Sequence, residues 1–321
     1  MPNKTIAIAM GGYSSEWEVS IRSGEFVYDT LKDTYVAYMA YILKDEWYIW
    51  HNATKIPIDK GDFSFVLNGS KVTFDVVFNT IHGSPGEDGL FQGYLTNLGI
   101  KQTASGYYTA ALSFNKRDCI SVLNSYNIPT ATNYFYNQGE PINSSEIVTQ
   151  VGLPCFVKAN RAGSSFGITK VKKEQEIHDA IHHALKEDDE VIIESFLEGR
   201  EFSVGVINYK GTVMALPITE IISENEFFDY EAKYLGKSQE ITPADLEESL
   251  TREVQNLAVR IFKILKMKGL TRSEFIFHNG KPHFLEINAC PGLTKASILP
   301  QQAKSAGIDI KDLFVNTIEM A

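Results

Sequence analysis

The sequence predicts a mixed α/β and α+β protein of two or three domains, with an open parallel α/β sheet at its N-terminus. Its 321 residues are too many for one ordinary hydrophobic core, and 44% hydrophobic residues is typical of a globular chain. The N-terminal "TIAIAMGG" indicates a strand that ends in a glycine turn, and a helical pattern and a further strand follow it. In such sheets, ligands bind beyond the carboxyl ends of the strands.

The N-terminal elements follow from the spacing of apolar residues. Residues 5–10 form the first predicted strand, and "SSEWEVSIRSGEFVYDTL" predicts a helix with Ser14 or Ser15 as its N-cap. Its apolar side chains lie on roughly one face, namely Val19, Phe26, Val27 and Leu31. The strand "FDVVFNTIHG" is expected to end at His82, and "DGLFQGYLTNLG" predicts the next helix. Glu16 and His82 therefore both fall at strand ends, where a ligand would bind.

The middle of the chain, from about Gly106 to Glu194, mixes helices and strands. The segment "YYTAALSFNKRDCISVLNSY" predicts one helix that stops near Pro129. Before the strand "EVIIESF", we expect three short strands and a helix, at about 131–136, 154–159, 167–172 and 174–186.

The stretch "KANRAGSSFG", Lys158 to Gly167, lies between two of these strands, so it forms a hairpin tip and a natural mobile lid. Its small residues let backbone N–H groups approach a ligand closely, and the lysine indicates an anion such as a phosphate. It is not a Walker loop, because there the lysine follows the glycines and a helix comes next.

The last third opens with "EFSVGVINYKGTVMALPITEI", which predicts an antiparallel pair turning at Lys210-Gly211. A long irregular segment containing "FFDYEAKYLGKSQE" follows, and then a helix from about Ala244 to Met267. Asn279-Gly280 is a type I′ hairpin signal between two alternating strands. The chain is expected to end in helices.

Composition excludes several classes of protein. A formal charge of -10 disfavours a nucleic-acid partner, since that binding depends on clustered Lys and Arg. No apolar run approaches a membrane-spanning length, and the N-terminal apolar run is too short for a signal peptide, so we expect a cytoplasmic protein without a membrane partner. The widely spaced cysteines, Cys119, Cys155 and Cys290, argue for reduced thiols that pack in the interior and against a zinc site.

The final hairpin brings acidic residues together. Glu274 lies near the start of one strand, and Glu286 and Asn288 share one face of the other. Positions 274 and 286 are nearly symmetric about the turn, and carboxylates about 4 Å apart repel by roughly 4 kcal/mol at an effective dielectric constant of ~20. This predicts a cation such as Mg²⁺ between them, with Arg272 adding a permanent charge on the same side. The alternative is a solvated polar face, and the hairpin alone does not decide between the two.

Several segments together resemble one family. "GGYSSEWEVS", "IHGSPGEDG", "VKANRAGSSFG", "FFDYEAKY", "LTRSEFIF" and "LEINACPGLT" occur in the order and spacing of D-alanine:D-alanine ligases of the ATP-grasp superfamily. The resemblance covers nearly the whole chain and implies a three-domain ATP-grasp fold. It implies an N-terminal domain for the first D-alanine (1–105), a central domain with the lid loop (106–194), and a C-terminal domain with the metal, oxyanion and second-substrate sites (195–321). The resemblance also implies a homodimer.

The resemblance assigns residues to ATP and metal. It places ATP phosphates on Lys116, Lys158 and Ser165, and the adenine and ribose on Glu194, Phe196, Leu197 and Glu201. The Mg²⁺ ligands, for two ions and with Mn²⁺ as an alternative metal, match Glu274, Glu286 and Asn288. The sequence departs from the commoner family pattern at Glu274, where Asp is more frequent, and at Ala159, where the family's loop has proline.

The same resemblance assigns substrate and catalytic residues. Glu16 matches the residue that binds the ammonium group of the first D-alanine, with His82 beside it, and Ser164 and Tyr234 match residues that hydrogen-bond with that glutamate. Lys233 and Ser297 match residues that hold the carboxylate of the second substrate. Arg272 and the backbone N–H of Gly292 match the oxyanion site. The implied reaction passes through a D-alanyl phosphate, which the second amine attacks.

Taken singly, these residues have plainer interpretations. Lys116 would be a solvated helix lysine, Glu16 a first-turn residue that complements the helix dipole, and His82 a structural histidine. Two alternative functions remain: a depsipeptide ligase that uses D-lactate, which commonly has phenylalanine where Tyr234 stands, and an ATP-binding module without catalysis. A carboxylase-type ATP-grasp enzyme does not fit the N-terminal signatures.

Overall fold

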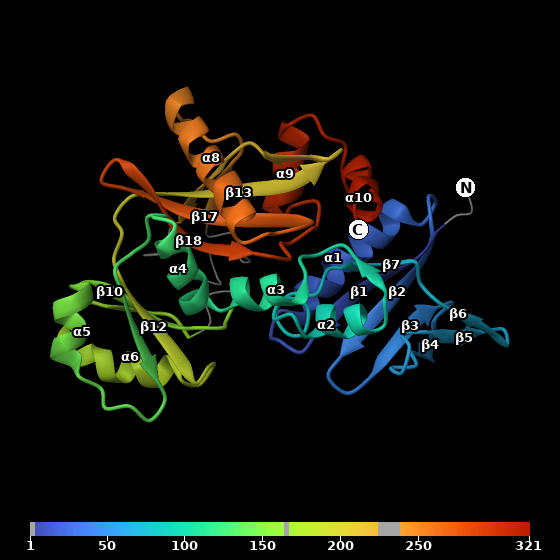
Figure 1. The fold of residues 1–321 in the computed structure, drawn as a ribbon, viewed down its shortest axis with the longest axis horizontal. Helices are drawn as coiled ribbons and strands as arrows, with labels where there is room; N and C mark the ends of the chain where they lie inside the picture. The colour runs from blue at the N-terminus through green and yellow to red at the C-terminus, as the bar shows by residue number, and fades with distance from the viewer. Residues whose placement is uncertain (1–3, 164–166, 224–237) are drawn as a thin grey trace.

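The computed structural model describes residues 4–163, 167–223 and 238–321. Its N-terminal part is an open sheet in the strand order β4-β3-β2-β1-β7-β8, in which β1 pairs in parallel with both β2 and β7. This confirms the predicted α/β unit, at the right of Figure 1. Its elements are β1 (Thr5–Gly12), α1 (Trp17–Leu31), β2 (Val36–Leu43), β3 (Trp47–His51), β4 (Thr54–Pro57), β5 (Phe65–Leu67), β6 (Ser70–Val72), β7 (Val76–Asn79), α2 (Leu90–Asn97) and β8 (Lys101–Gln102).

Helix α1 differs from the prediction at its start. Its N-cap is Glu16, without a side-chain capping bond, so the predicted serine cap is wrong. Ser14 Oγ instead donates to the carbonyl of His82 at 2.9 Å, which ties the turn after β1 to the turn after β7. The buried face carries small residues beside the predicted apolar ones: Ser20, Ser23, Gly24, Val27 and Leu31. Strand β7 ends at Asn79, three residues before the predicted end.

The central sheet has the order β11-β10-β12-β9, and β10 and β11 form the predicted hairpin around the Gly/Ser loop. Helices α5 and α6 cover one face of it, at the lower left of Figure 1. A 3₁₀ turn precedes α6, which is shorter than predicted. The bounds are β9 (Asn133–Asn137), α5 (Ser144–Val151), β10 (Cys155–Ala159), β11 (Thr169–Val171), the 3₁₀ turn (Glu174–Glu176), α6 (Ile177–Ala184) and β12 (Glu190–Ser195).

The single helix predicted before Pro129 is wrong, because it is two helices, α3 (Tyr107–Phe114) and α4 (Lys116–Ser125). They meet at Asn115, whose backbone is extended and whose side chain accepts the N–H of Asp118. Asn115 is therefore the N-cap of α4, and Lys116 is the first residue of that helix.

The C-terminal sheet has the order β16-β15-β13-β17-β18, with β14 added beside β13. Both predicted glycine turns are confirmed, since Lys210, Gly211, Asn279 and Gly280 all have positive φ. Helix α8 begins four residues later and ends three residues earlier than predicted. The bounds are β13 (Arg200–Tyr209), β14 (Thr212–Ala215), β15 (Thr219–Ser223), β16 (Ser238–Ile241), α8 (Glu248–Ile264), β17 (Leu270–His278), β18 (Lys281–Asn288), α9 (Ile298–Ser305) and α10 (Ile310–Glu319).

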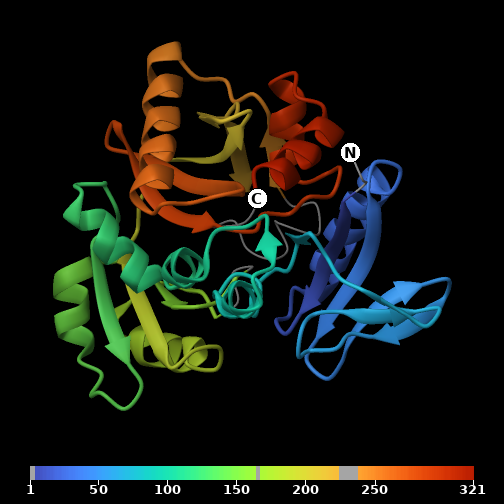
Figure 2. The same cartoon turned by 45° about the vertical axis from the view of Figure 1, so that its right-hand side comes forward.

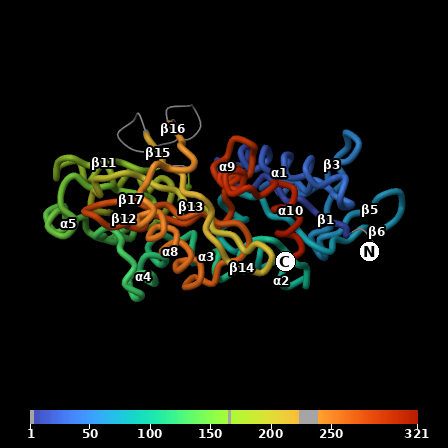
Figure 3. Tube along the Cα trace, turned by 90° about the horizontal axis from the view of Figure 1, so that it is seen from above, coloured from blue at the N-terminus to red at the C-terminus, as the bar shows by residue number. Residues whose placement is uncertain are grey.

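Hydrophobic cores join parts of the chain that are far apart in sequence. Side chains of α4 pack into the core formed by α8, β13, β17 and β18. Helices α9 and α10 share a core with β1 and α1, and Figure 3 shows α10 close to α1 at that end of the molecule. In Figure 2 the central sheet and the C-terminal sheet form separate lobes that face each other. Consequently, the space between these lobes is bounded by strands of both.

The predicted packing role of the cysteines is confirmed, since Cys119, Cys155 and Cys290 are free and buried. None of the helices in the described residues is both long and apolar enough to cross a lipid bilayer.

Candidate active site

A cleft of about 730 Å³, part of it open to solvent, lies between the central and C-terminal sheets. Most of the residues assigned to ATP from the sequence line it, together with two of the proposed metal ligands. Its lining consists of Lys116, Ala131, Phe156, Lys158, Ile168, Glu194, Ser195, Leu197, Glu201, Glu274, Ile276, Leu285 and Glu286. The lining combines apolar side chains with two lysines and four glutamates, so the cleft suits a ligand that has both an apolar part and an anionic part.

Lys158 and Glu194 form an ion pair of 2.6 Å across β10 and β12. Burial by itself would lower the pKa of Lys158, but Glu194, Glu286 and Glu201 outweigh it and hold the pKa above its usual value. Lys158 therefore stays charged inside the cleft. The second carboxylate oxygen of Glu194, Oε1, is buried and has no hydrogen-bond partner among the described residues. Such an atom can accept a hydrogen bond from a ligand.

The predicted pairing of carboxylates on the final hairpin is confirmed. Glu274 of β17 lies directly opposite Glu286 of β18, and Arg272 lies opposite Asn288 on the same two strands. The guanidinium of Arg272 contacts Glu274 and donates to Ser203 Oγ at 3.0 Å, and Lys116 Nζ lies 3.6 Å from Glu286 Oε2. Each acid thus has a cationic side chain beside it. Although burial opposes its charge, these acids hold the pKa of Arg272 above its usual value.

The Gly/Ser loop approaches Glu16. A Cβ atom added to Gly163 would lie 3.1 Å from Cδ and 3.3 Å from Oε1 of Glu16, and still closer to Oε2. Only a glycine fits there without displacing the carboxylate. The small residue at Gly163 therefore allows the loop to pass close to the Glu16 carboxylate, whereas the predicted approach of the loop to a phosphate stays a prediction.

The turn after β7 meets the turn after β18. His82 is buried, and its Nδ1 lies 2.8 Å from the carbonyl oxygen of Cys290 while its Nε2 lies 3.4 Å from Ser23 Oγ. Burial lowers the pKa of His82, so the ring is neutral at pH 7.

Glu87 joins the same two turns. Its carboxylate accepts the N–H groups of Gly83 at 2.8 Å and of Cys290 at 3.0 Å. Burial, and after it the charge of Glu16, raises the pKa of Glu87 to about 8 despite these two donors. Glu87 lies in the quoted segment "IHGSPGEDG", yet sequence reasoning gave it no role. The signal in the sequence is an acidic residue among Gly and Pro in the segment that follows a buried strand.

The proposed second-substrate residue Ser297 lies next to Gly292. A Cβ atom on Gly292 would be 2.9 Å from Ser297 Oγ, and that hydroxyl pairs with Thr294 Oγ1 at 2.8 Å. Phe196 is not among the residues that line the cleft, and its ring packs against Phe156. Ser164, Ser165, Lys233 and Tyr234 lie outside the described residues.

Comparison with known proteins identifies the family of this chain. Residues 5–105 match the family model described as "D-ala D-ala ligase N-terminus", and residues 122–319 match "D-ala D-ala ligase C-terminus". The chain is 62% identical over 320 residues to the D-alanine--D-alanine ligase of Christiangramia forsetii, covering 99% of this chain and 98% of that one. It is 58% identical to the D-alanine--D-alanine ligase of Flavobacterium johnsoniae, covering 99% of each.

Solved structures have the same fold. D-alanyl-alanine synthetase A from Vibrio cholerae superposes with a TM-score of 0.90 at 27% identity, over 99% of this chain and 98% of that one. The VanG D-Ala:D-Ser ligase from Enterococcus faecalis superposes with a TM-score of 0.87 at 28% identity, covering 99% of both chains. The D-alanine--D-alanine ligase from Bacillus anthracis, solved in complex with ATP, superposes with a TM-score of 0.79 at 26% identity, covering 99% of this chain and 97% of that one. The predicted three-domain ATP-grasp fold class is thereby confirmed, and the chain belongs to the D-alanine--D-alanine ligase family.

Proposed function

We propose that this protein is an ATP-dependent ligase that joins two D-alanine molecules into D-alanyl-D-alanine for peptidoglycan synthesis. The observation that carries the proposal is the cleft in which Lys116, Lys158, Glu274 and Glu286 converge, in a chain related to D-alanine--D-alanine ligases over its whole length. The identity to relatives of that name is high enough to assign the same reaction.

ATP binds in this cleft. The apolar side chains that line the cleft accept the adenine ring. Glu194 Oε1, which lacks a hydrogen-bond partner among the described residues, accepts a hydrogen bond from an amino or hydroxyl group of the nucleoside. Lys116 and Lys158 bind the phosphates, with Ser165 beside them, and Leu197 and Glu201 complete the nucleoside pocket. Phe196 supports that pocket indirectly, by packing against Phe156, which lines the cleft.

Glu274, Glu286 and Asn288 of the final hairpin would hold magnesium, or manganese in its place, and we expect two ions. No three described His, Cys, Asp or Glu side chains are placed to hold a metal by themselves, so an amide oxygen and the phosphates complete the set. Glu274 and Glu286 supply hard oxygen ligands, and the buried Nδ2 of Asn288 has no partner among the described residues, so its amide can turn its oxygen to a cation. When bound, the metal would supply positive charge beside the phosphates.

The reaction has two steps. In the first, the γ-phosphoryl group of ATP passes to a carboxylate oxygen of one D-alanine, giving D-alanyl phosphate and ADP. In the second, the amine of the other D-alanine attacks the acyl carbon, the C–O bond to phosphate breaks, and the amine loses a proton. A free carboxylate is a poor electrophile because its leaving group would be oxide, and phosphorylation removes this obstacle. No protein nucleophile is needed.

The residues around the cleft orient these reactants. Glu16 binds the ammonium group of the first D-alanine, and the neutral ring of His82 lies beside that position. Arg272 and the N–H of Gly292 stabilise the oxyanion that forms when the second amine attacks. Ser297 and Lys233 hold the second carboxylate. Ser164 and Tyr234, which lie outside the described residues, hydrogen-bond with Glu16 in this proposal.

We further propose the domain division 1–105, 106–194 and 195–321, a homodimer, and a cytoplasmic location, where ATP is supplied. The domain division is supported by the separate sheets, although α4 packs into the core of the third domain and α10 into that of the first.

The test is release of ADP from Mg-ATP with D-alanine, run beside L-alanine, D-alanine with D-lactate, and D-alanine with D-serine, with products identified by mass. ADP release matched by D-alanyl-D-alanine only when D-alanine is present supports the proposal. A D-alanyl-D-lactate or D-alanyl-D-serine product at equal substrate concentrations would replace it with a different ligase. Bound ATP without ADP release in any mixture would indicate a non-catalytic module. Chelation by EDTA should abolish ADP release, and Mg²⁺ or Mn²⁺ should restore it.

A further inference from the structure

The first residues of the Gly/Ser loop are tied to the start of α4 by a buried side chain. Asn160 follows β10 directly and is completely buried. Its Nδ2 donates to Asn115 Oδ1 at 2.9 Å and to Glu190 Oε2 at 2.7 Å, and its Oδ1 accepts the N–H of Arg117 at 2.8 Å. Every hydrogen of this amide group is therefore used, and its oxygen is bonded as well.

These bonds act on the N-terminus of α4, where backbone N–H groups have no partner within the helix. The side chain of Asn115, directly before α4, accepts the N–H of Asp118, and that of Asn160, 43 residues from Arg117 in sequence, accepts the N–H of Arg117. The backbone of Asn160 adds to the connection, since its carbonyl accepts the N–H of Lys116 at 3.4 Å. Asn160 is thus a second cap of α4, supplied by the loop.

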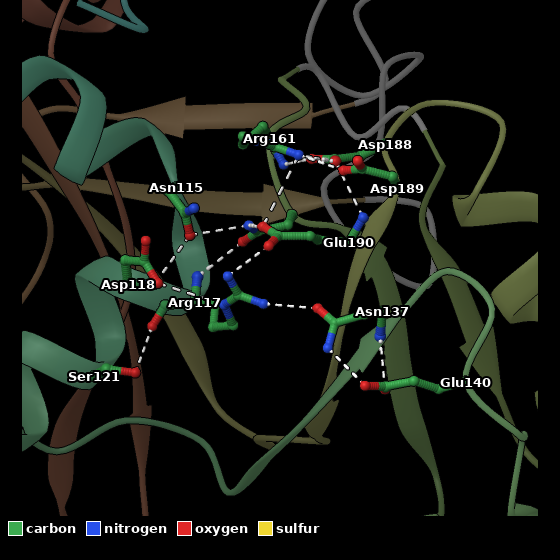
Figure 4. Close-up of polar contacts among 11 residues, drawn as sticks. Asn115, Arg117, Asp118, Ser121, Asn137, Glu140, Arg161, Asp188, Asp189 and Glu190 are labelled. Carbon is green, nitrogen blue, oxygen red and sulfur yellow. Dashed lines mark hydrogen bonds and ion pairs between the residues drawn. The ribbon is translucent and has the colours of Figure 1, made fainter.

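Charged side chains around this cap fix it in place, and Figure 4 shows Arg117 and Glu190 among them, near the neutral side chain of Asn115. Arg117 Nη2 pairs with Glu190 Oε1 at 2.5 Å, the carboxylate whose other oxygen binds Asn160. The next loop residue, Arg161, donates its backbone N–H and its guanidinium to Asp188 at 2.6–2.9 Å. The loop is therefore anchored at two successive residues before it reaches the cleft.

Lys116 is the side chain that this arrangement aims at the cleft. As the first residue of α4, its backbone position is set by the two caps. Its Nζ donates to the carbonyl oxygen of Ala162 at 2.7 Å and lies 3.6 Å from Glu286 Oε2. The same short loop segment therefore holds both the backbone and the side chain of Lys116.

We propose that Asn160 is a positioning residue for ATP binding, which acts by holding Lys116 at the phosphate end of the cleft. This rests on the proposed function, in which Lys116 binds ATP phosphates. Asparagine suits the position because it presents one acceptor to a helix N–H and two donors to oxygen atoms. Aspartate has the same shape but would turn an acceptor toward Glu190 and Asn115 Oδ1, where it meets only other oxygens.

The test variant is Asn160→Asp, and the matched control is Asn143→Asp. Asn143 is also a helix N-cap in the central domain whose Nδ2 faces a glutamate, Glu146 at 3.1 Å, but it lies on the surface away from the cleft. The primary measurement is the Kd of Mg²⁺ with a non-hydrolysable ATP analogue by calorimetry, without D-alanine. We expect Asn160→Asp to weaken analogue binding about tenfold or more and Asn143→Asp to leave it within twofold.

A double-mutant cycle with Lys116→Ala identifies the route of the effect. If Asn160 acts through Lys116, then Asn160→Asp should change the Kd by less than about twofold in the Lys116→Ala background. Equal weakening in both backgrounds, or no weakening in the wild-type background, would overturn the proposal. Because the experiment measures nucleotide binding, its result tests the role of Asn160 independently of whether D-alanine is the substrate.

A second variant distinguishes loss of the specific hydrogen bonds from general unfolding of the protein. In the double variant Asn160→Asp with Glu190→Gln, the new side-chain amide donates to the new carboxylate and keeps an oxygen for Arg117. We expect it to recover most of the lost analogue affinity, whereas Glu190→Gln alone should not improve binding. No recovery in a double variant that melts at the wild-type temperature would refute the specific hydrogen-bond role of Asn160.

Discussion

The contact between the Gly/Ser loop and Glu16 gives a sharp prediction for Gly163→Ala. The added methyl carbon would lie 3.1 Å from Glu16 Cδ and 3.3 Å from Oε1, and it would overlap Oε2. Since carbon atoms pack at about 3.5–4.0 Å, the carboxylate must move by about 1 Å. Glu16 sits at the start of α1 with a partly exposed side chain, so this movement should cost little stability.

Function should respond far more strongly than stability. Glu16 is the proposed partner of the ammonium group of the first D-alanine, and a misplacement of about 1 Å can reduce a rate about 100-fold. We expect kcat/KM for D-alanine to fall by about 10- to 100-fold, while KM for ATP stays within twofold. Steady-state ADP release at saturating Mg-ATP over a range of D-alanine concentrations measures kcat/KM for D-alanine. A thermal melt measures stability.

The control is Gly93→Ala in α2, where the new Cβ would be 3.7 Å from Tyr107 Cβ, an ordinary contact. It should raise stability by about 0.5–1 kcal/mol through helix propensity and leave kcat/KM unchanged. Wild-type kcat/KM for D-alanine in Gly163→Ala would show that the position of the Glu16 carboxylate does not govern substrate binding. That result would refute the reasoning.

Three further predictions concern charged groups of the site. Arg272→Ala should lower kcat by about 10²–10³ with ATP affinity kept, and full turnover would exclude its oxyanion role. Lys158→Ala should raise KM for ATP at least tenfold and destabilise the fold by about 3–5 kcal/mol, because Glu194 is left buried and unpaired; an unchanged melting temperature would contradict this. The pKa of Glu87 is raised to about 8 from 4.5, so the folded state favours its protonated form. Protonated Glu87 therefore contributes its whole share of the free energy of unfolding below pH 4.5, and this share is lost as the pH rises through 8. The loss is on the order of 5 kcal/mol at most. Urea unfolding from pH 5 to 9 should show this slope in the wild type and a flatter one in Glu87→Gln, and parallel curves would disprove it.

Local patterns in the sequence were enough to predict the metal hairpin. Asn279-Gly280 defines a turn by backbone chemistry alone, and alternation on either side then fixes which residues share a face. Counting outward from that turn places Glu274 within one residue of Glu286, so the two could be predicted as cross-strand neighbours. The exact pairing depends on a β-bulge between Glu274 and Phe275, which shifts the register by one residue and was not visible in the pattern.

Features that depend on distant contacts could not be predicted in this way. The apolar pattern runs through Asn115 without a break, so one helix was expected where two exist. What favours the break is the cap formed with Asn160, which lies 45 residues away in sequence. The role of Glu87 was missed for the same reason, because one of its two partners, Cys290, lies 203 residues away in sequence. Burial in a core can be inferred from periodicity, but a polar group that bridges two domains has no periodic signal.

The shared core of the first strand and the last helix has a consequence for how the chain is made. Phe314 of α10 packs edge-on against Phe26 and Phe78, with ring centroids 6.2 and 5.6 Å apart, and Glu319 pairs with Lys4 and accepts a hydrogen bond from Tyr35. During synthesis on the ribosome, the strands of the N-terminal sheet emerge long before Phe314, which completes their core. Phe78 and its neighbours therefore remain uncovered on that face until α10 has also emerged.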